Sequence, residues 1–249
     1  MKILICGVGG RMGREVAKLA LDGVRGATVT AGFDVIPVDT REFPTFTDWS
    51  AVKADIDCII DFSHHSATAA LLHFAKAKNI PVVIATTGHT DAEKAEILDA
   101  AKQIPVFHSA NMSLGIALLV ELAKTATRAF PDADIEIIEK HHNRKLDAPS
   151  GTALLLANAI KEIRKNANFI FGRGGQAKRE ANEIGIHAVR MGNIIGEHEV
   201  IIGTDSQTIT LKHEAHSRAL FAEGALAAAE YLCGKPAGLY DMERMISQN

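Results

Sequence analysis

The sequence predicts an α/β protein in two parts: a Rossmann-like, doubly wound parallel sheet and a C-terminal α+β domain with a mixed or antiparallel sheet. Three observations carry this prediction. Short apolar segments alternate with helical patterns as far as Phe107, a glycine-rich turn follows the first of them, and segments with alternating polarity appear after Glu183. A chain of 249 residues is long enough for two domains.

The first part is predicted from strands that are apolar on both faces, as in a parallel sheet covered by helices. The strands are expected at residues 2–6, 28–33, 56–62, 81–85 and 104–107, and the helices at 11–21, 64–78 and 91–102. This alternation implies right-handed βαβ units. The class it favours is a nucleotide-binding doubly wound domain.

The second part is predicted from a change of pattern after Asn111. Helices are expected at 114–130 and 152–164, and strands at 135–139, 184–191, 197–202 and 208–213. An alanine-rich helix is expected at 217–233, followed by Gly234 and Pro236. Its face of small residues could pack closely against the first domain. We therefore expect residues 1–112 and 219–249 to form a discontinuous dinucleotide-binding domain, and residues 113–218 to form the substrate domain.

Composition narrows the class of protein. The net charge is −3, with 27 basic and 30 acidic residues interspersed, so no cationic surface for nucleic acid is expected. No apolar run reaches the length of a membrane span. Cys6, Cys58 and Cys233 are far apart and form no CxxC pair, which predicts buried, reduced thiols and a cytoplasmic protein.

The turn GVGGRMG, residues 7–13, has the features of a pyrophosphate site. Gly7, Val8, Gly9, Gly10, Arg11 and Met12 are the predicted cofactor-binding residues of this turn. Met12 stands where the usual fingerprint has its third glycine, and Gly13, one place later, is expected to pack the helix against the strand. A glycine turn without a ligand is the alternative.

Asp34, at the end of the second strand, can accept hydrogen bonds from the ribose hydroxyls of adenosine. A carboxylate there favours NADH and repels a 2′-phosphate, although Arg11 could partly compensate and leaves NADPH open. Two further loops follow predicted parallel strands, where ligands bind in such sheets. Their predicted cofactor-binding residues, for the nicotinamide half, are Ala85, Thr86, Thr87, Ser109, Ala110, Asn111 and Met112.

The segment EKHHNRKLDAPSGT, residues 139–152, leaves a predicted strand, crosses a loop dense in ionisable groups and enters a helix. Free N–H groups at that helix start, with Ser150, Gly151 and Thr152, predict a carboxylate site. His141, His142 and Lys145 add positive charge and candidate acids or bases. A basic loop with a capped helix is an alternative; a metal site or a Ser150 nucleophile is disfavoured, because the HExxH and GxSxG patterns are missing.

These motifs together resemble the 4-hydroxy-tetrahydrodipicolinate reductase (dihydrodipicolinate reductase) family. The resemblance rests on GVGGRMGRE, ATTG at 85–88, SANMSLG at 109–115, IEIIEKHHNRKLDAPSGTAL at 135–154 and AHSRALFAEGAL at 215–226, in order over nearly the whole chain. Another two-domain dehydrogenase, acting on aspartate or homoserine, would explain residues 1–112 but not residues 141–152. A protein that binds NAD without catalysis would leave the clustered His and Lys residues unexplained.

The resemblance implies an NAD(P)H-dependent oxidoreductase of the diaminopimelate route to lysine, which reduces a small dicarboxylate to tetrahydrodipicolinate. Residues 7–12, Asp34 and the two nicotinamide loops would bind the cofactor. His141 and Lys145 would be the catalytic proton donors or acceptors, and His142, Gly151 and Thr152 would bind the substrate carboxylates, beside Ser150. The family's enzymes are typically homotetramers joined through the C-terminal sheets, so residues 113–218 would also serve oligomerisation.

Overall fold

The computed structural model describes residues 1–247. The chain forms two compact units, one made of Met1–Leu114 together with the chain from Arg218 onward, and the other of Gly115–Ser217. Each unit has its own hydrophobic core. Within residues 1–247, no helix combines the length and the apolar character that crossing a membrane requires.

The first unit contains a seven-stranded sheet in the order β12-β6-β5-β4-β1-β2-β3, and all its pairings are parallel. The strands are β1 (Lys2–Cys6), β2 (Thr28–Phe33), β3 (Thr45–Phe46), β4 (Cys58–Asp61), β5 (Val82–Ile84), β6 (Pro105–His108) and β12 (Gly238–Tyr240). The strand order reverses between β1 and β4, because β2 lies on one side of β1 and β4 to β6 on the other. Ligands of open α/β sheets bind at the carboxyl ends of the strands beside such a point.

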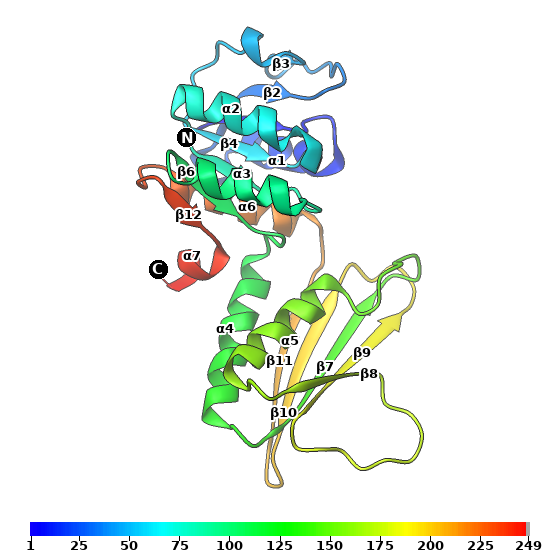
Figure 1. The fold of residues 1–249 in the computed structure, drawn as a ribbon. Helices are drawn as coiled ribbons and strands as arrows, with labels where there is room; N and C mark the ends of the chain where they lie inside the picture. The colour runs from blue at the N-terminus through cyan, green and yellow to red at the C-terminus, as the bar shows by residue number, and fades with distance from the viewer. Residues whose placement is uncertain (248–249) are drawn as a thin grey trace. The chain divides into compact units, whose positions relative to one another are not determined.

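Two pairs of helices cover this sheet (Figure 1). Helix α1 (Arg11–Leu21) packs on α6 (Ala219–Leu232), and α2 (Thr68–Lys78) packs on α3 (Asp91–Ala100). Helix α6 lies against β4, β5 and β6 in the first unit, although it follows the whole second unit in sequence. Gly224 allows this approach, because a Cβ there would lie 1.7 Å from the carbonyl oxygen of Met112.

The second unit contains a five-stranded sheet in the order β11-β10-β7-β9-β8. Its strands are β7 (Asp134–His141), β8 (Asn168–Phe171), β9 (Glu183–Arg190), β10 (Glu197–Gly203) and β11 (Thr208–Glu214). Strands β7, β8 and β9 are mutually parallel, whereas β10 runs antiparallel to both of its neighbours. Helices α4 (Leu114–Ala129) and α5 (Gly151–Ile163) lie on one face of this sheet (Figure 1).

Successive side chains of β7 point to opposite faces of the sheet, so that one face of the strand is buried and the other is partly exposed. Ile135, Ile137, Glu139 and His141 are buried, and the residues between them are partly exposed. The isoleucines join Leu119 of α4 and Leu156 of α5 in the core. One charged residue, Glu139, therefore shares the buried face with the isoleucines.

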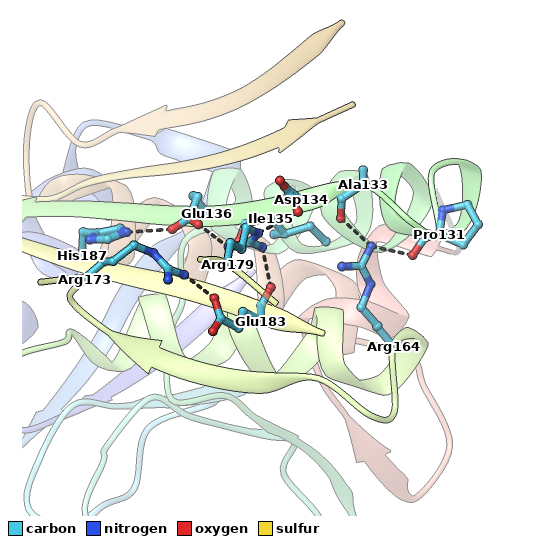
Figure 2. A network of polar contacts seen from close by, with 10 residues as sticks. All are labelled: Pro131, Ala133, Asp134, Ile135, Glu136, Arg164, Arg173, Arg179, Glu183 and His187. Atoms are coloured by element: carbon cyan, nitrogen blue, oxygen red, sulfur yellow. Dashed lines mark hydrogen bonds and ion pairs between the residues drawn. The ribbon is translucent and has the colours of Figure 1, made fainter. Parts of the chain in front are cut away.

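The opposite face of the sheet carries an open polar network centred on Glu136 (Figure 2). Arg179 Nη1 lies 2.5 Å from one carboxylate oxygen of Glu136, and His187 Nε2 lies 2.7 Å from the other. Arg179 also donates to Asp134 and to the Ile135 and Glu183 carbonyl oxygens. Gly185 makes room for the network, since a Cβ there would lie 1.7 Å from Glu136 Oε2.

The predicted fold class is confirmed, with a parallel sheet and a mixed sheet in the expected order. Strands β1 and β2 and helix α1 have the predicted bounds, and most other elements differ by one to four residues at their ends. Strands β3, β8 and β12 and helix α7 (Met242–Ser247) were not predicted. The three strands are only two to four residues long, too short to show a period in the sequence.

Candidate active site

The glycine turn lies between β1 and α1 and is closely packed on itself. Gly7 has φ +79°, and a Cβ there would lie 2.6 Å from the Phe62 carbonyl oxygen. A Cβ on Gly13 would lie 2.2 Å from the Gly7 carbonyl oxygen. The late glycine therefore lets the helix approach the turn itself, where the sequence predicted an approach to the strand.

Helix α1 begins after Gly10, which has no side chain to cap the first N–H groups of the helix. Such N–H groups and the positive end of the helix dipole favour an anion. A cavity of about 880 Å³ opens beside the turn and is lined by Gly7, Gly9, Gly10 and Asp34, among others. The turn thus fits a dinucleotide pyrophosphate, because the glycines keep side chains out of the space that the phosphates need.

Asp34 follows β2 and faces the glycine turn. Its Oδ2 accepts a hydrogen bond of 2.9 Å from the Gly9 N–H, and its Oδ1 accepts one of 3.3 Å from the Ile36 N–H. The carboxylate is thereby held at the wall of the 880 Å³ cavity. This position suits recognition of ribose hydroxyls next to the pyrophosphate.

A second cavity, of about 410 Å³, collects most of the residues predicted for the nicotinamide half. Its lining includes Arg11, Met12, Ala85, Thr86, Thr87, Ala110 and Met112. Ser109 and Asn111 do not line either cavity. Instead the Ser109 hydroxyl donates to the Asn111 carbonyl oxygen at 2.7 Å and shapes the loop, while Val8 is buried behind the turn.

Several further residues line these cavities and were not predicted as site residues. Phe62 and Ser63 line both, directly after β4, and Arg218 and Phe221 line the second. Asp61 holds the Ser63 loop by accepting from its hydroxyl at 2.5 Å and its N–H at 3.1 Å, and burial raises the pKa of Asp61. A signal existed for Phe62 and Ser63, because they follow an apolar strand as Thr86 does.

In the second unit, Ser150 caps the start of α5. Its hydroxyl accepts from the Ala153 N–H at 3.1 Å and is bonded to His198 Nε2 at 2.9 Å. Its own N–H donates to Glu139 Oε1 at 3.0 Å. Both polar groups of Ser150 are therefore engaged within the protein, and the N–H groups of Gly151 and Thr152 come next along the helix start.

A carboxylate that the sequence analysis did not single out lies at the centre of this site. Glu139 has a fully buried side chain, and its Oε2 accepts from His141 Nδ1 at 2.6 Å. Arg190, which the sheet register places opposite His141, donates to both carboxylate oxygens, at 2.7 and 2.8 Å. Burial alone would raise the pKa of Glu139, but the bonds from His141, Arg190 and the Ser150 N–H outweigh it and lower the pKa to about 2.

His198 is the second histidine of this cluster. Its ring lies edge-on to that of His141, with 5.2 Å between the centroids. Burial, reinforced by the neighbouring His141, lowers the pKa of His198 to about 3, so its imidazole is neutral at pH 7. Through Nε2, His198 holds the Ser150 hydroxyl.

The remaining predicted residues lie on the loop between β7 and α5. Lys145 Nζ is 2.8 Å from Asp147 Oδ1, and the Asp147 carbonyl oxygen accepts from Arg190 at 2.7 Å. The His142 N–H donates to the Ile194 carbonyl oxygen at 2.7 Å. His141, the Lys145 loop and the start of α5 are thus brought together by Glu139 and Arg190.

Two other predictions concern cysteines and metals. Cys6 and Cys58 are buried, as predicted, but Cys233 is exposed, because it follows the last turn of α6 at the surface of the first unit. Across residues 1–247, no group of three or more His, Cys, Asp or Glu side chains is arranged to hold a metal ion. His187 and His198 bond to Glu136 and Ser150 respectively.

A doubly wound sheet with a glycine turn at its switch point, in a chain with a second unit that gathers acid and base groups, defines the class of two-domain dinucleotide-dependent oxidoreductases. Comparison with known proteins identifies the family within that class. A family model described as dihydrodipicolinate reductase, N-terminus, matches residues 1–112, and one described as dihydrodipicolinate reductase, C-terminus, matches residues 115–246. The chain belongs to the dihydrodipicolinate reductase family.

Individual relatives agree over their full length. The 4-hydroxy-tetrahydrodipicolinate reductase of Caldanaerobacter subterraneus subsp. tengcongensis is 46% identical, covering 100% of this chain and 99% of its own. That of Clostridium novyi is 45% identical and covers 98% of each chain. Among solved structures, a dipicolinate-bound dihydrodipicolinate reductase from Paenisporosarcina sp. TG-14 matches with a TM-score of 0.82, 26% identity and 98% coverage of both chains.

Proposed function

We propose that this protein reduces 4-hydroxy-tetrahydrodipicolinate, by way of dihydrodipicolinate, to tetrahydrodipicolinate in the diaminopimelate route to lysine, with NAD(P)H as reductant. The observation that carries the proposal is the enclosed cluster of Glu139, His141 and Arg190 beside the start of α5. It lies in a chain whose relatives share its full length and are 4-hydroxy-tetrahydrodipicolinate reductases. The dipicolinate-bound relative supports a small dicarboxylate as the substrate class.

The cofactor favoured by the first unit is NADH, with NADPH as the alternative. Asp34 stands at the wall of the larger cavity, where its charge repels a 2′-phosphate. Arg14 lines the same cavity and Arg11 lines the second, so cationic groups near the turn could offset part of that repulsion. The two cavities match the two halves of a dinucleotide, with Phe62 and Ser63 shared by both.

The bound nicotinamide cofactor would supply the hydride. The chain's own residues supply the proton and hold the substrate. His141 Nε2 or the Lys145 ammonium is the proton donor, and both residues are tied to the start of α5 through Glu139 and Arg190. The N–H groups of Gly151 and Thr152, with His142, are the proposed carboxylate contacts, because a helix start favours an anion.

The proposal extends to assembly and location. We propose that four chains associate through the second unit. Buried thiols at Cys6 and Cys58 suit a reducing, cytoplasmic setting.

The test is an assay of the purified full chain. The product of condensing pyruvate with aspartate semialdehyde is offered as substrate, and the loss of reduced nicotinamide absorbance is followed with NADH and, separately, with NADPH. We expect turnover with both and a higher kcat/KM with NADH. No turnover with either cofactor, in protein that binds NADH, would overturn the proposal.

A pair of lysine variants locates the chemistry. Lys145→Ala should lower kcat by about 10²-fold or more, because a positioned general acid contributes on that scale, and should leave NADH affinity within twofold. Lys178→Ala is the matched control, since Lys178 is exposed on the loop before β9. Near-normal turnover of Lys145→Ala would remove Lys145 from the mechanism and leave His141 as the donor.

A further inference from the structure

Glu139 joins three parts of the candidate site, namely His141, Arg190 and the start of α5. Its carboxylate accepts from His141 Nδ1, from the Ser150 N–H and from two nitrogens of Arg190. We propose that Glu139 is the positioning residue of the site: it fixes the tautomer and orientation of His141, and ties that histidine to the helix start that binds the substrate. This inference rests on the proposed function for the reaction it serves.

Glu139 acts through its neighbours because substrate cannot reach it. The side chain has no exposed surface, and its three partners use both carboxylate oxygens. Arg190 supplies a guanidinium with two parallel N–H groups, the geometry that best matches an ionised carboxylate. An ionised Glu139 can only accept hydrogen bonds.

The ionised carboxylate of Glu139 determines which ring nitrogen of neutral His141 carries the hydrogen. Because the carboxylate only accepts, the nitrogen of His141 that faces it must carry a hydrogen, so neutral His141 holds its proton on Nδ1. The other nitrogen, Nε2, is then the atom that gains and loses the catalytic proton. Gly196 leaves Nε2 accessible, since a Cβ there would come within 3.1 Å of it.

Arg190 extends the same control to the lysine loop. Its Nη2 donates to the Asp147 carbonyl oxygen at 2.7 Å, and the Asp147 carboxylate holds Lys145 Nζ at 2.8 Å. The acid candidates and the start of α5 are therefore positioned by one buried ion pair. A loss of the Glu139 charge should disturb proton transfer more than it disturbs cofactor binding in the first unit.

The first experiment observes the wild-type protein and needs no turnover. Full-length protein labelled with ¹⁵N in histidine is titrated by NMR, and the His141 signals are assigned by their loss in His141→Gln. We expect neutral His141 to carry its proton on Nδ1. The Nε2–H tautomer would overturn the inference even if the protein is an active reductase, and the Nδ1–H tautomer would support it even if the reductase assay failed.

The second experiment compares Glu139→Gln with Glu136→Gln, a matched change on the opposite face of the same strand. Glu139→Gln should lower kcat about 100-fold, leave the KM for NADH within twofold, and admit the Nε2–H tautomer of neutral His141, because an amide can donate to Nδ1 as well as accept from it. Glu136→Gln should change none of the three. A kcat and a tautomer that both stay unchanged in folded Glu139→Gln would overturn the inference, and if that variant does not fold, the wild-type tautomer decides.

Discussion

The two faces of the mixed sheet each carry a cluster of one glutamate, one histidine and one arginine. On the helix-covered face these are Glu139, His141 and Arg190; on the other face they are Glu136, His187 and Arg179 (Figure 2). The glutamate–histidine distances, 2.6 and 2.7 Å, are almost equal, and the two arginines are both 18% exposed. Residue type, glutamate–histidine distance and arginine exposure therefore do not distinguish the clusters.

The difference lies in enclosure and in what stands next to each cluster. The side chains of Glu139 and His141 are 0% and 11% exposed, whereas those of Glu136 and His187 are 28% and 34% exposed. The enclosed cluster also bonds to the N-cap of α5, a helix start of the kind that favours an anion, while the open one bonds to backbone carbonyls of its own sheet. An acid and base set becomes chemically useful where water is excluded and an anion site adjoins it.

The largest effect expected from this comparison is on turnover. His141→Gln should lower kcat by about 10²-fold or more, because a positioned acid or base is lost, whereas His187→Gln should leave kcat within twofold. Steady-state kinetics with saturating NADH measure both. Equal losses in the two variants would mean that the enclosed cluster has no special part in the reaction.

The next effect is on stability, and it compares the two arginines. Arg190→Met leaves the Glu139 carboxylate buried without its cation, which should lower the free energy of unfolding by about 3 kcal/mol. Arg179→Met leaves Glu136 partly solvated and should cost about 1 kcal/mol. Urea unfolding followed by circular dichroism at pH 7 gives both values.

The pH dependence of the same measurement checks the cause. The Arg190→Met penalty should shrink as the pH falls towards 4, because protonated Glu139 no longer needs a cation. A penalty that is equal for the two arginines, or independent of pH, would contradict the role assigned to enclosure.

Part of the candidate site could be predicted from the sequence. Residues 141–152 were recognisable as a site because they are contiguous, and the glycine turn because it follows a strand. Glu139 had a local signal as well, since it alternates with Ile135 and Ile137 on what should be an apolar face, where a lone carboxylate must be paired. We did not draw that inference from the alternation.

Other parts depend on contacts between distant segments. Arg190 meets Glu139 only because β9 pairs with β7, although α5, β8 and a long loop separate these two strands in sequence. Which of His187 and His198 faces the helices depends on strand register, and a shift of one residue would exchange the two faces. The roles of the predicted site residues, as distinct from their positions, stay predictions until the variants are assayed.

The smallest effect expected is the pH dependence contributed by His198. Its pKa is about 3 when folded, against 6.5 when exposed, because burial and then His141 disfavour its charge. The unfolded chain therefore binds the proton more readily between these values, so the stabilisation present above pH 6.5 is lost as the pH falls. The pKa of Glu139 is about 2 in the folded protein, against 4.5 when the side chain is exposed. Its contribution to the free energy of unfolding is therefore lost only below pH 4.5.

The variant His198→Gln separates the contributions of His198 and Glu139 to the pH dependence of stability. It removes the titrating imidazole but keeps a side-chain nitrogen that can reach Ser150. Wild-type protein should lose roughly 2 kcal/mol of unfolding free energy between pH 7 and pH 4.5 through this group, and His198→Gln should lose correspondingly less. His187→Gln, from the open face, should follow the wild-type curve. If instead His187→Gln flattens the curve and His198→Gln does not, the open histidine is the one that resists protonation, and enclosure does not separate the two clusters.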